Sequence, residues 1–286
     1  EELTADVAMI CDTGLFGDHT PGIVTRLRGL LGEELTIKGP SKDLHSGMYG
    51  GPAMNPARVL AKIIAALHDD QGRITVPGFY DCVPELPPKI AAQWEGLNFD
   101  QDGFLGQVDL SDLAGEQGRS ALEMVWSRPT CEGKGMWSGY TGEGFKTVLP
   151  SEAHAKISFR LVGQQDPHVI RENFRAMVRG LMPADCSVTF KPHGASAGSE
   201  MSILNPAFDV ARAALSDEWP NPAAFVGCGG SIPIAGHFKS ILGMDAMLIG
   251  FARENDAIHS PNEKYDLRSF HKGIRSWARI LHRLYE

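Results

Sequence analysis

Four short stretches of the sequence carry residues that could do chemistry. Asp12 ends the apolar run ADVAMICD, His45 lies in KDLHSG, and His259 lies in AIHSPNEK. The fourth stretch is the glycine-rich GCGGSIP at residues 227–233. Aspartate and histidine are good zinc ligands, but a catalytic zinc normally has three protein ligands and an open position. The residues alone therefore do not define a metal site.

Each stretch also has an ordinary structural explanation. Asp12 could cap a turn, His45 could lie solvated on a loop, and His259 could be a polar residue after a strand. Gly229 and Gly230 could serve only to adopt positive φ angles. Taken one at a time, local chemistry favours these structural interpretations.

The glycine-rich stretch fails two motif tests. It is not a dinucleotide-binding fingerprint, because Ile232 stands where the third glycine belongs. It is not a nucleophile elbow, because Pro233 replaces the last glycine of G-x-S-x-G. What remains is a strand followed by two glycines, a hydroxyl and a proline, and the backbone N–H groups of such a turn can hold a carboxylate or an oxyanion.

Composition excludes several classes of protein. The 286 residues are 43% hydrophobic and 22% charged, as in an ordinary soluble protein of about two domains. The net charge of −8 and the lack of a dense Lys/Arg run argue against a nucleic-acid partner. Five scattered cysteines without a C-x-x-C pair indicate a reducing compartment rather than a disulfide framework. No stretch has the features of a membrane span or a signal peptide, so we expect a cytoplasmic protein with no membrane partner.

The apolar pattern predicts both strands and helices. Apolar runs over residues 5–12, 223–230 and 246–251 predict buried strands of a largely parallel sheet, whose carboxyl ends carry sites in open α/β folds. Alternation predicts one or two solvent-faced strands within residues 24–38 and a half-buried strand over residues 153–162. Capping residues and helical spacing predict helices after Asn55-Pro56, over residues 166–181, from Asn205-Pro206 onward and over residues 267–284.

These elements divide the chain into two expected domains. Residues 1–23 and 194–286 are expected to form part of an α/β domain with a mostly parallel sheet. Residues 24–193 are expected to form an inserted α+β domain. Within it, residues 77–140 are rich in proline, glycine and aromatics, which predicts an irregular insertion.

The whole set of motifs, in this order, resembles one family, the co-catalytic zinc peptidases. That family includes carboxypeptidase G, aminoacylase, acetylornithine deacetylase, succinyl-diaminopimelate desuccinylase and the carnosinase-type dipeptidases. The resemblance runs nearly end to end and rests on DVAMICDT, GPSKDLHSGMYGG, RPT, GYTGEGFKTVLPSEAHAKISFRLV, GCGGSIP and HSPNEK. The long insertion and GYTGEGFKTVLP look most like the dipeptidase branch. Two departures, RLVGQQDP where relatives usually have proline after RLV, and RENDAIHSPNE where they more often have two aspartates and an asparagine, remove no ligand.

The resemblance implies a dinuclear metal site and a homodimer. Asp12 would bind one of two zinc ions and His259 the other, with manganese or cobalt as alternative metals. The first domain would be the catalytic domain, and the inserted domain would be a lid that also forms the dimer. His45 on this lid would act in trans, stabilising the oxyanion of the tetrahedral intermediate in the opposite subunit.

The resemblance also implies the substrate and the reaction. Arg160 would hold the carboxylate of a small peptide, helped by Gly230 and Ser231 through backbone or hydroxyl hydrogen bonds. The expected function is zinc-dependent hydrolysis of the amide bond of dipeptides or small peptides with a free C-terminal carboxylate. The alternatives are an N-acyl-amino-acid deacylase or deacetylase of the same family, and a non-catalytic dimerisation or lid module.

Part of the family's site is expected to be absent. In the family, the His-x-Asp motif, the general-base glutamate and its neighbouring glutamate ligand all precede the strand that Asp12 follows. Glu1 and Glu2 lie too close to this strand to be that glutamate pair, and we reject them as the base. We therefore expect an N-terminally truncated chain that lacks the general base and several ligands and is inactive alone.

Overall fold

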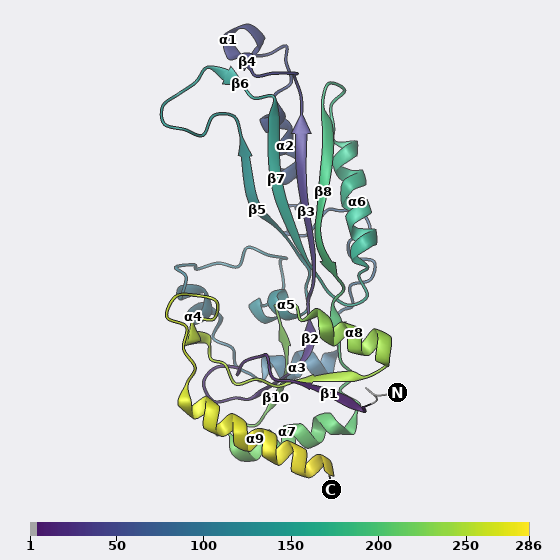
Figure 1. Cartoon of the computed structure of the whole chain (residues 1–286), viewed down its shortest axis with the longest axis vertical. Helices are drawn as coiled ribbons and strands as arrows, with labels where there is room; N and C mark the ends of the chain where they lie inside the picture. Colours follow the sequence, from purple (N-terminus) through teal and green to yellow (C-terminus); the bar gives the residue numbers. More distant parts are fainter. Residues whose placement is uncertain (1–4, 286) are drawn as a thin grey trace.

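The structure is a computed structural model, and it describes residues 5–285. Two sheets lie one above the other along the long axis of the molecule (Figure 1). We call them the lower sheet and the upper sheet, as they stand in that view. None of the helices within residues 5–285 is long and apolar enough to cross a membrane.

The lower sheet mixes parallel and antiparallel pairs. Its strands run in the order β1 (Val7–Ile10), β11 (Asp245–Leu248), β2 (Gly22–Leu27) and β10 (Ala224–Cys228), and β9 (Ser199–Glu200) pairs with β2. The β1–β11 and β2–β10 pairs are parallel, whereas β11 meets β2 in an antiparallel bridge. This is the α/β fold that the apolar runs predict. The strands expected within residues 223–230 and 246–251 are present as β10 and β11.

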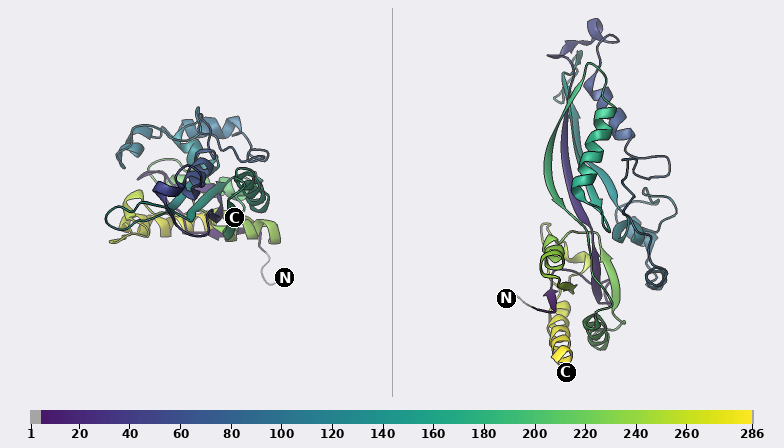
Figure 2. Two further views of the ribbon diagram at one scale, coloured as in Figure 1. Left: turned by 90° about the horizontal axis from the view of Figure 1, so that it is seen from above. Right: turned by 90° about the vertical axis from the view of Figure 1, so that its right-hand side faces the viewer.

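The upper sheet is antiparallel, with β5 (Thr130–Ser138), β7 (Glu152–Leu161), β3 (Gly29–Lys38) and β8 (Ser187–Ser196) in that order. Along β7, small and apolar residues alternate with polar ones. The small and apolar residues are buried. They pack against α2 (Pro56–Ala65) and α6 (Pro167–Gly180), which cover one face of the sheet (Figure 2). Asn55 and Asp166 cap these helices through their side chains, as the sequence predicts. The other face of the sheet stays open.

The far tip of the upper part carries a small two-stranded sheet. Here β4 (Leu44–His45) pairs with β6 (Val148–Leu149), and the short helix α1 (Ser46–Tyr49) follows β4 directly. In Figure 1 this tip lies at the opposite end of the molecule from β1.

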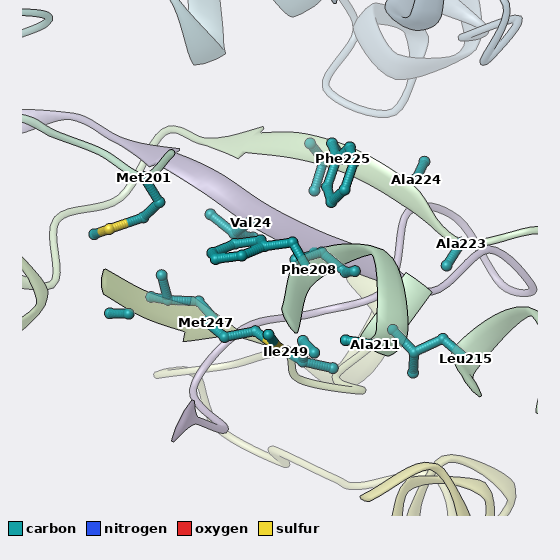
Figure 3. Packing of buried hydrophobic residues seen from close by; sticks show 14 of the residues in the cluster. Val24, Met201, Phe208, Ala211, Leu215, Ala223, Ala224, Phe225, Met247 and Ile249 are labelled. Atoms are coloured by element: carbon teal, nitrogen blue, oxygen red, sulfur yellow. The ribbon is translucent and has the colours of Figure 1, made fainter. Parts of the chain in front are cut away.

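Helices α7 (Pro206–Glu218), α8 (Pro233–Leu242) and α9 (Leu267–Tyr285) accompany the lower sheet. Phe208 of α7 packs near Phe225 of β10, with ring centroids 6.4 Å apart, and Met247 of β11 joins the same core (Figure 3). Helix α9 buries mainly small residues, including Ser269 and Gly273. The apolar residues that gave α9 its helical periodicity lie largely on its outer side.

The boundary between the two parts differs from the expected one at Val24. Strand β2 continues to Leu27 in the lower sheet, and β3 begins at Gly29 in the upper sheet. The chain therefore crosses between the sheets at Arg28. The alternation expected over residues 24–38 holds in β3, where every second residue is buried, but not in β2, which is buried along nearly its whole length.

The insertion expected over residues 77–140 is divided between the two sheets. Helices α3 (Pro88–Glu95), α4 (Gln101–Gly106) and α5 (Ala121–Trp126) lie beside the lower sheet, where Trp94 donates a hydrogen bond to the Phe225 carbonyl and packs edge-on against Trp126. Residues 130–138 instead form β5, a strand of the upper sheet. Its two glycines and a register shift weaken the strand pattern in the sequence.

Candidate functional site

A cavity of about 1180 Å³ opens where β1 and β11 end. Its walls include residues 11–17 after β1, residues 251–254 and Asp256 after β11, and parts of α4 and α5. Because β1 and β11 are neighbouring parallel strands, the segments that follow them leave the sheet at the same edge. The volume is suited to a small ligand.

The predicted metal ligands lie on the two loops beside this cavity. Asp12 follows β1, is exposed and lines the cavity. His259 is exposed on the loop after β11, and its near neighbours Ile258 and Glu263 line the cavity. The structure thus brings the loops of both residues to one cavity.

An ion pair between the half-exposed Lys264 and the buried Asp256 closes the loop that carries His259, which we call the His259 loop (residues 253–264). Asp256, in the short 3-10 helix Glu254–Asp256, is buried and accepts a hydrogen bond from Lys264 Nζ at 2.9 Å. The Arg253 amide donates to the same carboxylate at 2.8 Å. Burial disfavours the charged form, but these donors outweigh it and hold the pKa of Asp256 below its ordinary value. Sequence analysis did not single out Asp256 or Lys264.

The His259 loop is also conformationally restricted. Ala257, His259 and Asn262 have φ angles of 54°, 62° and 63°, a left-handed region that non-glycine residues rarely adopt. Such conformations cost on the order of 1 kcal/mol each and persist where the surroundings impose them, often at functional sites. The His259 amide donates to the Glu263 carboxylate at 3.3 Å, which helps to fix the backbone at the histidine.

The side chains present do not complete a metal centre. Within residues 5–285, no group of three or more His, Cys, Asp or Glu side chains is placed to hold a metal ion. Asp12 and His259 alone fall short of the three protein ligands of a catalytic zinc. Glu1 and Glu2, rejected above as the base, lie outside the described residues.

Arg160, Gly230 and Ser231 meet where the upper sheet joins the lower one. Arg160, on the open face of β7, donates from Nη1 to Ser231 Oγ at 2.9 Å. The Ser231 hydroxyl donates to the Arg28 carbonyl at 2.5 Å, so its single proton is already engaged. Cys228, which immediately precedes this turn, lines the cavity.

The turn at residues 229–231 lies in a positive environment, and its Gly230 amide makes one weak hydrogen bond, to Cys228 Sγ at 3.4 Å. It directly precedes α8, and the N-terminus of a helix favours an anion. Gly229 allows a close approach to α5, since a Cβ there would lie 2.9 Å from Val125 Cγ1. The turn and Arg160 together can therefore receive a carboxylate.

A second guanidinium, that of Arg28, stands behind this turn. It donates from Nε to the Gly229 carbonyl at 3.1 Å and from Nη1 to the Met124 carbonyl at 3.2 Å. Burial and the neighbouring charge of Arg160 lower the pKa of Arg28 to about 10. Sequence analysis missed Arg28, because its partners lie far away along the chain.

His45 lies far from the cavity within one chain. It ends β4 at the far tip and caps α1, where its Nδ1 accepts the Gly47 amide at 3.1 Å (Figure 1). Large apolar side chains are exposed around the tip, including Met48 at 73% and Phe145 at 92%. The structure therefore does not join His45 to Asp12, His259 or Arg160 in a single chain.

Comparisons with known proteins agree with these features. A family model described as "Peptidase dimerisation domain" matches residues 25–186. The Cys-Gly metallodipeptidase dug1 of Schizosaccharomyces pombe is 29% identical over 283 residues, covering 98% of this chain and 60% of that protein. The Beta-Ala-His dipeptidase of Homo sapiens is 24% identical over 276 residues, covering 96% of this chain and 54% of that protein.

A solved structure is similar over the whole chain. The M20 family metallo-carboxypeptidase Sso-CP2 from Sulfolobus solfataricus has a TM-score of 0.87 against this fold, at 28% identity. The match covers 99% of this chain and 64% of that one. This chain thus spans only 54% to 60% of the length of the two curated relatives.

Proposed function

This chain belongs to the M20 metallopeptidase family, on its dipeptidase branch, and from that premise we propose that it acts in the hydrolysis of dipeptides or other small peptides with a free C-terminal carboxylate. One observation carries the proposal. Arg160 bonds to Ser231 of the 229–231 turn before α8, and this turn directly follows Cys228 on the wall of a cavity of about 1180 Å³, so these groups could bind a carboxylate there. The Asp12 and His259 loops border the same cavity.

The carboxylate would be held mainly by Arg160. A guanidinium can present two parallel N–H donors to a carboxylate, which fixes its orientation as well as its position. Because the Ser231 hydroxyl proton goes to the Arg28 carbonyl, Ser231 is expected to help through its backbone N–H and by orienting Arg160. A peptide amide lacks the negative charge that this group attracts, so the free acid should be strongly preferred.

The proposed enzyme uses two divalent ions per active site, zinc or alternatively manganese or cobalt. Asp12 would be a ligand of one ion and His259 a ligand of the other. These two side chains complete neither site. We therefore expect the 286-residue polypeptide alone to bind zinc weakly and to cleave no peptides.

The proposed assembly is a homodimer formed through the upper part of the molecule. The match to the dimerisation domain supports it, and so do the edge strands β5 and β8, each of which pairs on one side only within the described sheet. His45 would act in the partner's site, which its position at the far tip supports. A cytoplasmic location is supported by the five free cysteines.

Hydrolysis assays with the natural gene product test the function. Cys-Gly, β-Ala-His and their C-terminal amides would be offered as substrates, with and without a chelator. We expect chelator-sensitive cleavage of the free acids and at least about a hundredfold lower kcat/KM for the amides, since a lost contact to a charged group costs about 1.5–3 kcal/mol and more when the group stays buried.

Three other outcomes would contradict the proposal. Cleavage of N-acyl amino acids in preference to dipeptides would favour the deacylase alternative. No turnover of either class would favour a non-catalytic dimerisation or lid module. Equal cleavage of acids and amides would remove the role of Arg160.

A further inference from the structure

Arg28 is the residue at which the chain passes from one sheet to the other. Strand β2 ends at Leu27 in the lower sheet, and β3 starts at Gly29 in the upper sheet. Arg160, on β7, lies directly across from Leu30 of β3. Arg28 therefore lies between the strand that carries Arg160 and the turn at residues 229–231.

Its backbone and side chain contact every residue of that turn. The Arg28 amide donates to the Gly230 carbonyl at 3.2 Å, and the Arg28 carbonyl accepts from Ser231 Oγ at 2.5 Å. The guanidinium donates to the Gly229 carbonyl at 3.1 Å and to the Met124 carbonyl on α5 at 3.2 Å. These contacts hold the turn between α5 and the start of β3.

We propose that Arg28 is a positioning residue of the carboxylate subsite, fixing the 229–231 turn so that Ser231 holds the Arg160 guanidinium ready for the substrate. This proposal rests on the proposed function, because it needs Arg160 to bind the substrate carboxylate. Arg28 itself acts through the turn and does not touch the substrate.

The chemistry of the side chain explains why an arginine stands here. Its planar group offers donors in fixed directions, so it joins two carbonyls on separate elements at once, which a flexible ammonium group does poorly. Both guanidinium groups donate to neutral oxygens. They face each other closely enough for Arg160 to lower the pKa of Arg28, and a bound carboxylate would relieve this repulsion.

The test compares Arg28→Lys with a matched control, Arg26→Lys, in the 286-residue polypeptide. Arg26 lies on β2, two residues before Arg28, but its side chain pairs with Glu200, away from the turn. Glycylglycine and glycylglycinamide would be titrated into each protein, with the arginine Nε–H signals followed by NMR. We expect the free acid, but not the amide, to shift the Arg160 signal in the unchanged protein. Arg28→Lys should raise the Kd for glycylglycine about tenfold or more, and Arg26→Lys should leave it unchanged.

A double-mutant cycle shows whether Arg28 acts through Ser231. Ser231→Ala removes the hydroxyl between the Arg28 carbonyl and Arg160, and it should also raise the Kd. If the two residues work as one unit, the double variant should be little worse than either single variant. In the natural enzyme, Arg28→Lys should raise KM about tenfold with kcat within about twofold, because only carboxylate binding changes.

The outcomes separate this inference from the proposed function. If the unchanged protein shifts with glycylglycine and Arg28→Lys binds it equally well, the role of Arg28 is refuted while the subsite stands. If the unchanged protein does not distinguish acid from amide, the subsite and the role of Arg28 both fall. If Arg28→Lys loses its circular dichroism spectrum, Gly229→Ala takes its place, since a Cβ there would lie 2.9 Å from Val125 Cγ1 and 3.0 Å from Arg28 Nη2 and would displace both side chains. An unchanged Kd in Gly229→Ala would then refute the proposal.

Discussion

Replacing Glu33 by glutamine should destabilise the upper sheet by about 3–5 kcal/mol, the cost of breaking one partner out of a buried ion pair. The Glu33 side chain is 0% exposed, and it accepts hydrogen bonds from Arg171 Nε at 2.9 Å and from Arg175 Nε at 3.0 Å. Glutamine keeps the shape but leaves the nearly buried Arg171 without a counter-charge. The carboxylate ties β3 to α6, so the loss should appear as loss of cooperative folding of the upper part.

Urea unfolding followed by circular dichroism measures this change, and Glu172→Gln is the matched control. Glu172 pairs with the same Arg175, but its side chain is 63% exposed, so its loss should cost no more than about 0.5 kcal/mol. A Glu33→Gln protein within about 1 kcal/mol of the unchanged one would refute the argument from burial. It would show that water reaches Arg171 and Arg175 more readily than the structure indicates.

Three further changes test other parts of the argument. In the proposed homodimer, His45→Ala should lower kcat by about 10²–10³ with metal content unchanged, and metal loss at normal kcat would contradict its proposed role. Lys264→Met should weaken metal binding in the natural enzyme about ten- to a hundredfold, because Asp256 would lose the partner that closes the His259 loop. Calorimetric titration would measure the metal affinity, and an unchanged affinity would refute this argument. Burial disfavours the charged form of Glu218, but the basic side chains of α9 outweigh it and lower its pKa below the ordinary 4.5. Its stabilising effect is therefore complete above about pH 4.5 and lost as the pH falls through the folded pKa. Glu218→Gln should make unfolding less dependent on pH below that point in urea titrations, and an unchanged acid dependence would contradict the assignment.

Local signals were sufficient to predict much of the fold. The helices α2, α6 and α7 begin where Asn55, Asp166 and Asn205 cap them, because a side-chain acceptor at that position meets a free backbone N–H. The alternation of apolar and polar residues likewise predicted β7, and the structure buries its apolar positions. The insertion could not be predicted in this way, since its helices are short and are positioned by contacts such as the one between Trp94 and the Phe225 carbonyl.

The same distinction between residues with and without a local sequence signal applies to the candidate site. Asp12 and His259 follow apolar runs, so strand ends and the family resemblance together pointed to their loops. Arg28 gave no such signal, because its side chain bonds to backbone carbonyls of Gly229 and Met124, which any residue type could supply. Residues that act through distant backbone atoms leave no spacing pattern in the sequence.

The proposed choice of scissile bond follows from where the two halves of the candidate site are attached. Arg160 belongs to the upper sheet, whereas Asp12 and the His259 loop extend from the lower sheet. A substrate held by its carboxylate at Arg160 can place only one particular amide bond at the Asp12 and His259 rim, because each further residue adds about 3.3–3.6 Å of extended chain. In the proposed enzyme, the position of the upper sheet relative to the lower one would therefore set how many residues lie between the scissile bond and the C-terminal carboxylate. Since the chain crosses between the sheets at Arg28, the residue proposed to order the carboxylate turn would also help to fix that number.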